Sequence, residues 1–445
     1  MKRLLKGGHV VDPTQGIDGA SDVLLDGDRV VAVGRDLAVD SGVEVIEIPD
    51  GLIVCPGFVD MHVHLRDPGQ EHKETIASGT AAAAAGGFTA VACMPNTQPV
   101  NDSAAVTRSI VERAALLGVV RVYPIGAVSK GMKGESLSEI ADLKGAGCVA
   151  VSDDGRPVAS ALLMRRALEY AGMFGIPVID HCEEPTLKGE GVAHEGFVAS
   201  MLGLRGIPAA AESIMVERDL ALAEMTGTPV HLAHLSTRQS LRAMDAAKSR
   251  GLKATCEVTP HHFTLTDERL TGPTSYDTNL KMNPPLRERA DVDAVLQGLR
   301  AGTVDVIATD HAPHQQDEKA VEFDRAPFGI IGLETAVPLA LDRLVHRGVI
   351  TFRRLVQLMS VNPSRILNLP GGSLRPGRLA DVTIIAPSAA IVIDVTRSKS
   401  LSRNSPFDGW TLRGAVAATI VGGRTVFVNG EIAGLAALRA AGERG

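Results

Sequence analysis

Hydrophobic and polar positions change their period along the chain, and the changes divide it into three parts. Near the N-terminus, short apolar runs at 23–25 and 30–33 stand between Gly, Asp and Pro, which predicts short β-strands joined by tight turns. The same pattern returns at 380–386, 415–421 and 424–429. Because each end alone is too short to close a core, we expect the two ends to pair into one small β-sandwich domain.

Between these ends, apolar strands alternate with Ala- and Leu-rich helical stretches, a pattern typical of parallel sheets in α/β proteins. The pattern predicts helices over 74–85, 104–117, 159–174, 211–225 and 238–249, and strands over 58–65, 88–94, 119–127, 147–152, 176–182, 229–235, 252–259 and 303–310. Parallel strands with helical returns and no Rossmann glycine motif favour a closed, TIM-like (β/α)8 barrel. The predicted domains are the barrel at 56–370 and the β domain formed by 1–55 and 371–445.

Composition narrows the class of protein. Hydrophobic residues make up 45% of the chain and charged residues 22%, which is ordinary for a folded globular protein. The net charge of −7, with Lys and Arg scattered, argues against nucleic acid as a partner, and no apolar run of about 20 residues indicates a membrane span. Five widely spaced cysteines and the lack of a signal-peptide pattern lead us to expect a cytoplasmic protein with free thiols.

Side chains that can bind a metal follow several of the predicted barrel strands. His62 and His64 lie two residues apart, so the strand period should place both imidazoles on one face, together with Phe58 and Asp60. Taken alone, such a pair is more often hydrogen-bonded or exposed than metal-bound. Other strand ends add Asp153, Asp154, His181, His234, Asp310 and His311.

The carboxyl ends of barrel strands meet at one face, so these side chains should gather there. Four His and two Asp suffice for two metal ions sharing a bridging carboxylate, and imidazole suits zinc. Each residue alone could be a satisfied core histidine or a helix cap, but six coincidences in one plane are improbable. Two such ions would clamp one hydroxide as the nucleophile, and Asp310 is suited to receive and deliver its proton.

Arg66 points to the chemistry of the substrate. It lies two residues beyond His64 and shares its strand parity, and a guanidinium so near the metals favours a substrate that carries a carboxylate. The alternative is a structural ion pair between Arg66 and Asp67 or Glu71.

The sequence supports predictions for two further histidines and for one loop. His231 has strand parity opposite to that of His234, so we expect it to face the helices. We expect His194 at the surface. The segment 312–330, rich in Pro, Gly and charge, is either a lid over the site or a static connecting loop.

Four segments of the chain resemble the signature segments of the long bacterial dihydroorotases, in the amidohydrolase superfamily. They are DMHVHLRDPG at 60–69, MPNT at 94–97, KMNPPLR at 281–287 and ATDHAPH at 308–314. The resemblance covers nearly the whole chain. It implies zinc-dependent, reversible cyclisation of N-carbamoyl-L-aspartate to (S)-dihydroorotate, the third step of de novo pyrimidine (UMP) synthesis.

Residue by residue, the resemblance implies two zinc ions per subunit. His62 and His64 would bind the first together with Asp310, and His181 and His234 would bind the second. The substrate would be held by His64, Arg66, Asn96, Asn283, His314, Phe328 and Gly329, and Asp310 would be the catalytic acid and base.

The bridging ligand departs from the pattern of the wider superfamily. Many members use a carboxylated lysine there, whereas this chain has Asp153 and Asp154. The motif favours Asp154 as the bridge, with Asp153 hydrogen-bonded behind it, and the alternative assignment stays open.

Two other functions stay open at this point. A hydantoinase or allantoinase would open related cyclic ureides on the same scaffold, but neutral hydantoins would not need Arg66. A non-catalytic scaffold relative should have lost metal ligands, whereas all six positions are filled here. As partners we expect a second copy in a homodimer, and an association with aspartate carbamoyltransferase stays open.

Overall fold

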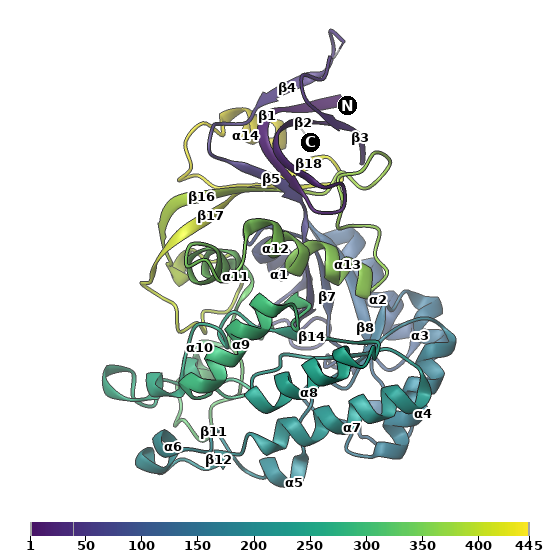
Figure 1. Ribbon diagram of the computed structural model, residues 1–445, viewed down its shortest axis with the longest axis vertical. Helices are drawn as coiled ribbons and strands as arrows, with labels where there is room; N and C mark the ends of the chain where they lie inside the picture. The colour runs from purple at the N-terminus through teal and green to yellow at the C-terminus, as the bar shows by residue number, and fades with distance from the viewer. Residues whose placement is uncertain (1, 39, 444–445) are drawn as a thin grey trace.

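The computed structural model describes residues 2–38 and 40–443 and contains a barrel sheet and a terminal sheet (Figure 1). The barrel sheet has the order β15-β14-β13-β10-β9-β8-β7-β6, and all neighbouring strands are parallel. Its strands are β6 (Phe58–Val63), β7 (Phe88–Cys93), β8 (Arg121–Gly126), β9 (Ala150–Ser152), β10 (Val178–Asp180), β13 (Val230–Leu232), β14 (Ala254–Val258) and β15 (Val306–Ile307).

The barrel closes between its first and last strands. Val63 forms a parallel bridge with His311, and the backbone N–H of His64 donates to the His311 carbonyl at 2.8 Å. Each predicted barrel strand contains one observed strand, so the α/β barrel prediction is confirmed. Most of the observed strands are shorter than predicted at both ends, and β9 is shorter only at its amino end.

Helices cover the outside of the barrel (Figure 1), and apolar side chains fill the layer between. The larger ones are α1 (Ile76–Ala85), α2 (Ala104–Leu117), α3 (Ile140–Ala146), α4 (Ala161–Met173), α7 (Ala210–Thr226), α8 (Arg238–Ser249), α9 (Arg289–Ala301) and α11 (Leu333–Ala340). A second apolar cluster, with Met61, Ile125 and Ile179, fills the barrel interior below the site. Among the described residues, no helix is both long and apolar enough to cross a membrane.

The first barrel strand contains an irregularity that changes which residues face the site. Its register against β7 shifts between Asp60 and Val63, so Met61 and His62 stand opposite a single residue of β7. Phe58 packs edge-on against Phe88 in the outer apolar layer, with ring centroids 6.4 Å apart. The prediction that Phe58 shares the face of His62 is therefore wrong, because the extra residue interrupts the alternation.

Strands from both ends of the chain form the terminal sheet, in the order β18-β17-β16-β5-β1-β2-β3 with β4 paired to β1. They are β1 (Lys2–Asp12), β2 (Ile17–Asp26), β3 (Arg29–Gly34), β4 (Glu44–Glu47), β5 (Ile53–Pro56), β16 (Val382–Val392), β17 (Thr411–Val421) and β18 (Arg424–Val428). β16 pairs antiparallel with β5, which joins the two ends.

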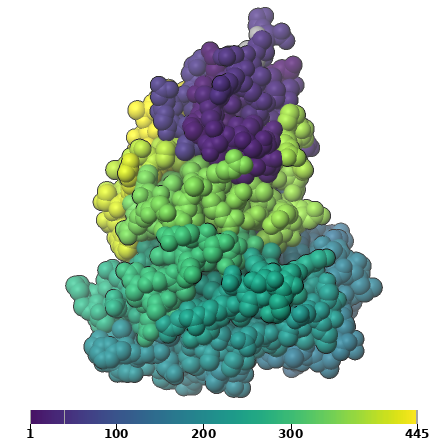
Figure 2. Space-filling view, in the orientation of Figure 1, coloured from purple at the N-terminus to yellow at the C-terminus, as the bar shows by residue number. Residues whose placement is uncertain are grey.

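Figures 1 and 2 show the purple N-terminal strands beside the green and yellow C-terminal ones at one end of the molecule. An apolar cluster that includes Val10, Ile384 and Leu438 packs this sheet against α14 (Ala436–Glu443). The prediction that both ends form one strand-rich domain is thus confirmed. Its described strands belong to one continuous sheet, so a sandwich of two separate sheets is not found. The limits of this domain at residues 55 and 371 stay a prediction.

Candidate metal centre and substrate pocket

Asp154, in the loop after β9, stands at the centre of the predicted ligands. Its Oδ1 lies 3.4 Å from each of His62 Nε2, His181 Nδ1 and His234 Nε2. Its Oδ2 lies 3.4 Å from His64 Nε2. The two oxygens of one carboxylate therefore face different histidines, which is the arrangement a bridging ligand requires.

Asp310 completes the cluster from the other side of the barrel. Its Oδ1 lies 3.1 Å from His64 Nε2 and 3.4 Å from His62 Nε2. Burial raises the pKa of this carboxyl, but the neighbouring His62 and His64 lower it more, so the net shift is downward. Asp310 is therefore a buried carboxylate beside the same histidines that surround Asp154.

Asp153 points away from the histidines. It accepts hydrogen bonds from the Ser129 backbone N–H at 3.1 Å and from the Ser129 hydroxyl. Burial raises the pKa of Asp153 to about 6, although the bonds from Ser129 oppose the shift. Of the two neighbouring aspartates, the structure brings Asp154 to the cluster, which supports it as the bridging position.

The cluster has the properties expected of a metal centre. His62 Nε2 and Asp154 Oδ1 are buried and lack a hydrogen-bond partner among residues 2–38 and 40–443. Two ligands held about 2.0–2.1 Å from one tetrahedral ion would lie about 3.4 Å apart, as these atoms do. His62, His64 and Asp310 form one set of close donor atoms, and His62, Asp154 and His234 form another. The donor set therefore fits metal binding.

Three residues of the site have left-handed backbone conformations. The φ angles are 61° at Arg66, 33° at His234 and 50° at Asp310, where each chain segment has just left its strand. Such conformations are strained for residues with a Cβ and persist only where the surrounding structure holds them. These turns lie where the three side chains enter the barrel mouth.

The left-handed turn at His234 also explains why the prediction for His231 is wrong. His231 is fully buried and faces the barrel interior, where its Nε2 donates to Glu257 Oε2 at 3.1 Å. β13 ends at Leu232, so parity cannot be counted from His231 to His234. Both histidines therefore point inward.

Glu257 is a functional candidate that the sequence analysis missed. It is fully buried in β14, and His62 Nδ1 donates to its Oε1 at 2.6 Å. Burial raises the pKa of Glu257, whereas His62 and His231 lower it more, so the net shift is downward. The carboxylate fixes the tautomer of His62 and aims its Nε2 at the cluster. An ionisable residue inside an apolar barrel strand was the available signal.

Two predicted substrate contacts also touch the ligand histidines. Asn96 Oδ1 accepts from His64 Nδ1 at 2.8 Å, which leaves His64 Nε2 for the cluster. Asn283 Nδ2 lies 3.3 Å from His181 Nε2 and donates to Glu183 Oε2 at 3.2 Å. These amides therefore line the site and also orient its histidines.

Arg66 is buried beside the cluster without an acidic partner. Its Nε donates to the Pro313 carbonyl at 3.2 Å, and no carboxylate oxygen of the described residues lies within 4.0 Å of its guanidinium. Burial lowers the pKa of Arg66 to about 10, which leaves it charged at neutral pH. Asp67 and Glu71 pair instead with Arg113. The structural ion pair considered for Arg66 is therefore wrong.

His314 lies next to Arg66 and is uncharged. Its Nε2 lies 2.9 Å from the Phe328 carbonyl and 3.3 Å from Arg66 Nη2. Because a carbonyl can only accept, Nε2 carries the proton and offers Arg66 no acceptor. Burial and the charge of Arg66 lower the pKa of His314 to about 2. The guanidinium thus retains donors for an anionic ligand.

The segment 312–330 is tied down along its length. Gly329 donates its N–H to the Lys281 carbonyl at 2.9 Å, and the buried Lys319 ammonium donates to the carbonyls of Pro327 at 2.8 Å and Gly329 at 3.0 Å. These bonds favour the static connecting loop over the lid.

His194 is also not where we expected it. It is buried, and its Nδ1 lies 3.1 Å from Arg287 Nη1. The short parallel pair β11 (Ala193–His194) and β12 (Gly206–Ile207) encloses it, so the prediction of a surface position is wrong. Short strand pairs of this kind leave no clear period in the sequence.

Comparison with known proteins decides the family. A family model described as Dihydro-orotase-like matches residues 51–240. A dihydroorotase from Geobacter metallireducens is 55% identical over 427 residues, which cover 96% of this chain and 100% of the relative. One from Acetivibrio thermocellus is 52% identical over 423 residues, covering 95% and 98%. The chain belongs to the dihydroorotase family. It is therefore a cyclic amidohydrolase, and the resemblance seen in the sequence is confirmed.

Solved structures give the same fold at much lower identity. The L-hydantoinase (dihydropyrimidinase) from Arthrobacter aurescens superposes with a TM-score of 0.87 at 24% identity and covers 97% of both chains. The dihydropyrimidinase from Brevibacillus agri gives 0.83 at 23% identity, covering 98% of this chain and 97% of its own. At this distance the likeness concerns the barrel and its terminal sheet alone.

Proposed function

We propose that this member of the dihydroorotase family catalyses the reversible cyclisation of N-carbamoyl-L-aspartate to (S)-dihydroorotate and water, the third step of UMP synthesis. The observation that carries the proposal is Arg66, a buried guanidinium beside the metal-ligand cluster that no carboxylate of the described residues neutralises. Both proposed reactants carry a carboxylate that a guanidinium can bind with two parallel hydrogen bonds. A neutral hydantoin would leave this charge buried and unpaired.

Two zinc ions are the metals that we propose for the cluster. His62, His64 and Asp310 would hold one, His181 and His234 would hold the other, and Asp154 would bridge them. The buried unpartnered atoms of His62 and Asp154 and the spacing of the donors support this assignment. When bound, such ions polarise a carbonyl and lower the pKa of a water molecule between them.

The side chains of the chain itself would position the substrate and move its proton. Arg66 would bind the substrate carboxylate, because its guanidinium retains donors, and His314 would contact the substrate beside it. Asn96, Asn283 and the backbone at Phe328 and Gly329 would orient the ring. Asp310 Oδ1, beside His64, would take the proton of the attacking water and deliver it to the leaving ring nitrogen.

The decisive experiment is a turnover assay of the purified protein with dihydroorotate, hydantoin and allantoin, alongside metal analysis. We expect turnover of dihydroorotate, little turnover of the two neutral ureides, and about two zinc ions per chain. Turnover of hydantoin without turnover of dihydroorotate would overturn the proposed function. Full activity with less than one metal ion per chain would overturn the two-metal assignment.

We also propose a cytoplasmic enzyme that forms a homodimer and can associate with aspartate carbamoyltransferase. All five cysteines are buried free thiols, which supports a reducing compartment. Light scattering of the chain alone and mixed with the transferase measures both assemblies. A monomer at every concentration would contradict the homodimer. Scattering of the mixture equal to the sum of its two components would contradict the association with the transferase.

A further inference from the structure

A segment far from the barrel in sequence holds the loop that carries the proposed substrate contacts. Asn404, between β16 and β17, is buried, and both ends of its amide are used. Its Oδ1 accepts from the His314 N–H at 3.1 Å, and its Nδ2 donates to the carbonyls of Ala312 and Gly329, each at 3.0 Å. One side chain thus joins the start of the segment 312–330 to its end.

The backbone of Asn404 adds to this arrangement. Its carbonyl accepts from the Ile331 N–H at 2.9 Å, and the Ala312 N–H donates to the Ile330 carbonyl at 2.8 Å. The two ends of the loop therefore lie side by side, with the amide of Asn404 between them. This pairing sets the separation between the imidazole of His314 and the backbone at Gly329.

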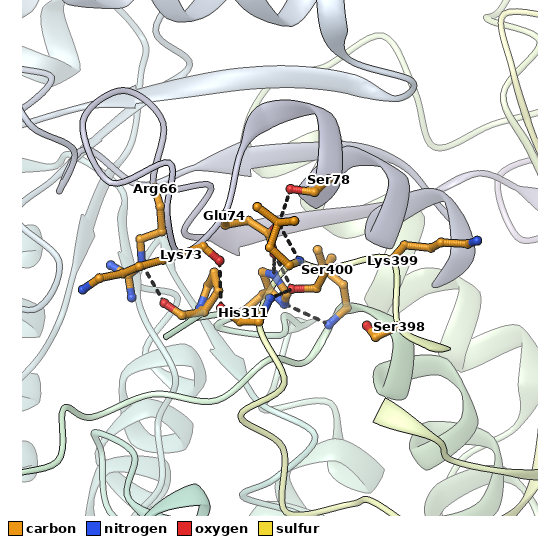
Figure 3. A network of polar contacts seen from close by, with 12 residues as sticks. Arg66, Lys73, Glu74, Ser78, His311, Ser398, Lys399 and Ser400 are labelled. Atoms are coloured by element: carbon orange, nitrogen blue, oxygen red, sulfur yellow. Dashed lines mark hydrogen bonds and ion pairs between the residues drawn. The ribbon is translucent and has the colours of Figure 1, made fainter. Parts of the chain in front are cut away.

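The segment that carries Asn404 is itself anchored to the barrel by two carboxylates. Glu74, fully buried before α1, accepts from the Ser400 hydroxyl and from the Leu401 N–H at 3.1 Å. Glu334, at the start of α11, accepts from the Lys399 N–H at 2.8 Å. Figure 3 shows Glu74 between Ser400 and His311. His311 follows Asp310, and its Nε2 lies 3.3 Å from Glu74 Oε2.

We propose that Asn404 is a positioning residue for substrate binding, which holds His314 and the Gly329 backbone at the distance the substrate needs. This proposal rests on the proposed function, since it assigns the loop to the substrate. Among the described residues, Asn404 bonds to no proposed ligand of the metal cluster, so its loss should change substrate affinity more than the chemical step. An amide side chain suits this position because its oxygen accepts the bond from the His314 N–H while its nitrogen donates to the two carbonyls.

The test compares Asn404→Ala and Asn404→Asp with the control Asn429→Ala. Asn429 also bonds backbone groups, the Val416 carbonyl and the Glu431 N–H, but it lies away from the loop. KM and kcat are measured with dihydroorotate, metal content is determined, and amide hydrogen exchange is followed over 312–330.

For Asn404→Ala we expect KM to rise about tenfold, kcat to stay within about threefold and metal content to stay unchanged. In Asn404→Asp the side chain keeps its size and can still accept from the His314 N–H. Its second oxygen faces the carbonyls of Ala312 and Gly329, to which it cannot donate, so KM should rise at least as much. Exchange over 312–330 should become faster in both variants, and Asn429→Ala should match the wild type.

An unchanged KM in both Asn404 variants would overturn the proposal. So would a loss of kcat with constant KM and unchanged exchange in the loop, because a smaller folded fraction explains that result. If the wild type turned over a neutral ureide instead, the proposed function would fail, and the same KM and exchange comparison with that substrate would still decide the role of Asn404.

Discussion

The two halves of the site are built in different ways. The metal half uses His62, Asp154 and His181, which lie on or directly after barrel strands and point at one another across the mouth. The substrate half uses Arg66 and His314, which lie in loops and take their positions from distant parts of the chain. A sheet can place ligands by its own geometry, whereas a loop needs contacts from outside to hold its shape.

This difference has a consequence for mutational effects. Changes in the metal half should abolish chemistry, and changes in the substrate half should alter which molecule binds and how tightly.

The strongest test of the metal half replaces Asp154 and Asp153 separately. Asp154→Asn should lower turnover at least about a thousandfold and reduce bound metal, because it removes the charge that faces four histidines. Asp153→Asn should stay within about tenfold, since an amide can still bond Ser129. Steady-state turnover and metal analysis of both variants decide this, and the reverse ranking would move the bridge to Asp153.

The strongest test of the substrate half is Arg66→Ala. Loss of the guanidinium should reduce kcat/KM for dihydroorotate about a thousandfold, with metal content unchanged. The control is Arg108→Ala, which removes an exposed arginine of α2 and should stay within about twofold. Near-normal turnover by Arg66→Ala would remove the argument for a carboxylate-bearing substrate.

Glu257 tests whether the metal half depends on a residue behind its ligands. Glu257→Gln keeps the shape but removes the charge that orients His62, so metal affinity should fall about 10- to 100-fold. Competition against a chelator of known affinity measures this directly, with exposed Glu112→Gln as the control. Equal affinities in wild type and Glu257→Gln would show that the strand geometry alone positions His62.

Lys319 tests how the loop of the substrate half is held. Burial, and the nearby charge of Lys281, lower its pKa from 10.5 to about 7 in the folded protein. Between these values the unfolded chain binds one more proton, so this group makes the free energy of unfolding rise with pH, by at most about 1.4 kcal/mol per unit. Below about pH 7 both states are protonated and the slope vanishes.

Denaturant unfolding of wild type and Lys319→Met at about pH 7 and about pH 9 measures the effect. We expect the difference in unfolding free energy between the two proteins to change by about 1–2 kcal/mol over this range. Exposed Lys133→Met should follow the wild type at both values. A pH-independent difference for Lys319→Met would show that this ammonium stays charged in the fold.

Much of the fold and of the metal half could be predicted from the sequence, since barrel strands keep an apolar pattern and their ligands follow at the carboxyl ends. Two of the wrong predictions, those for Phe58 and His231, share one physical cause. Both count alternation across an irregularity, a bulge for Phe58 and a left-handed residue for His231, and the pattern of apolar and polar residues reveals neither.

The supports of the substrate half could not be predicted for a different reason. Asn404 contacts the loop from a distant part of the chain, and an amide in a short segment has no period that marks its partner. The alternation of apolar and polar residues predicts which way a side chain points within a strand. It does not predict which distant segment packs beside that side chain.

The pairing of β5 with β16 gives the molecule an order of assembly. Cys55 stands opposite Thr383, so this ladder cannot form on the ribosome until most of the chain has been synthesised. Pairings between residues so far apart in sequence close slowly. Asn404 lies beyond β16 in the sequence, so the nascent chain contains every barrel strand before it contains the residue that joins the two ends of the substrate loop.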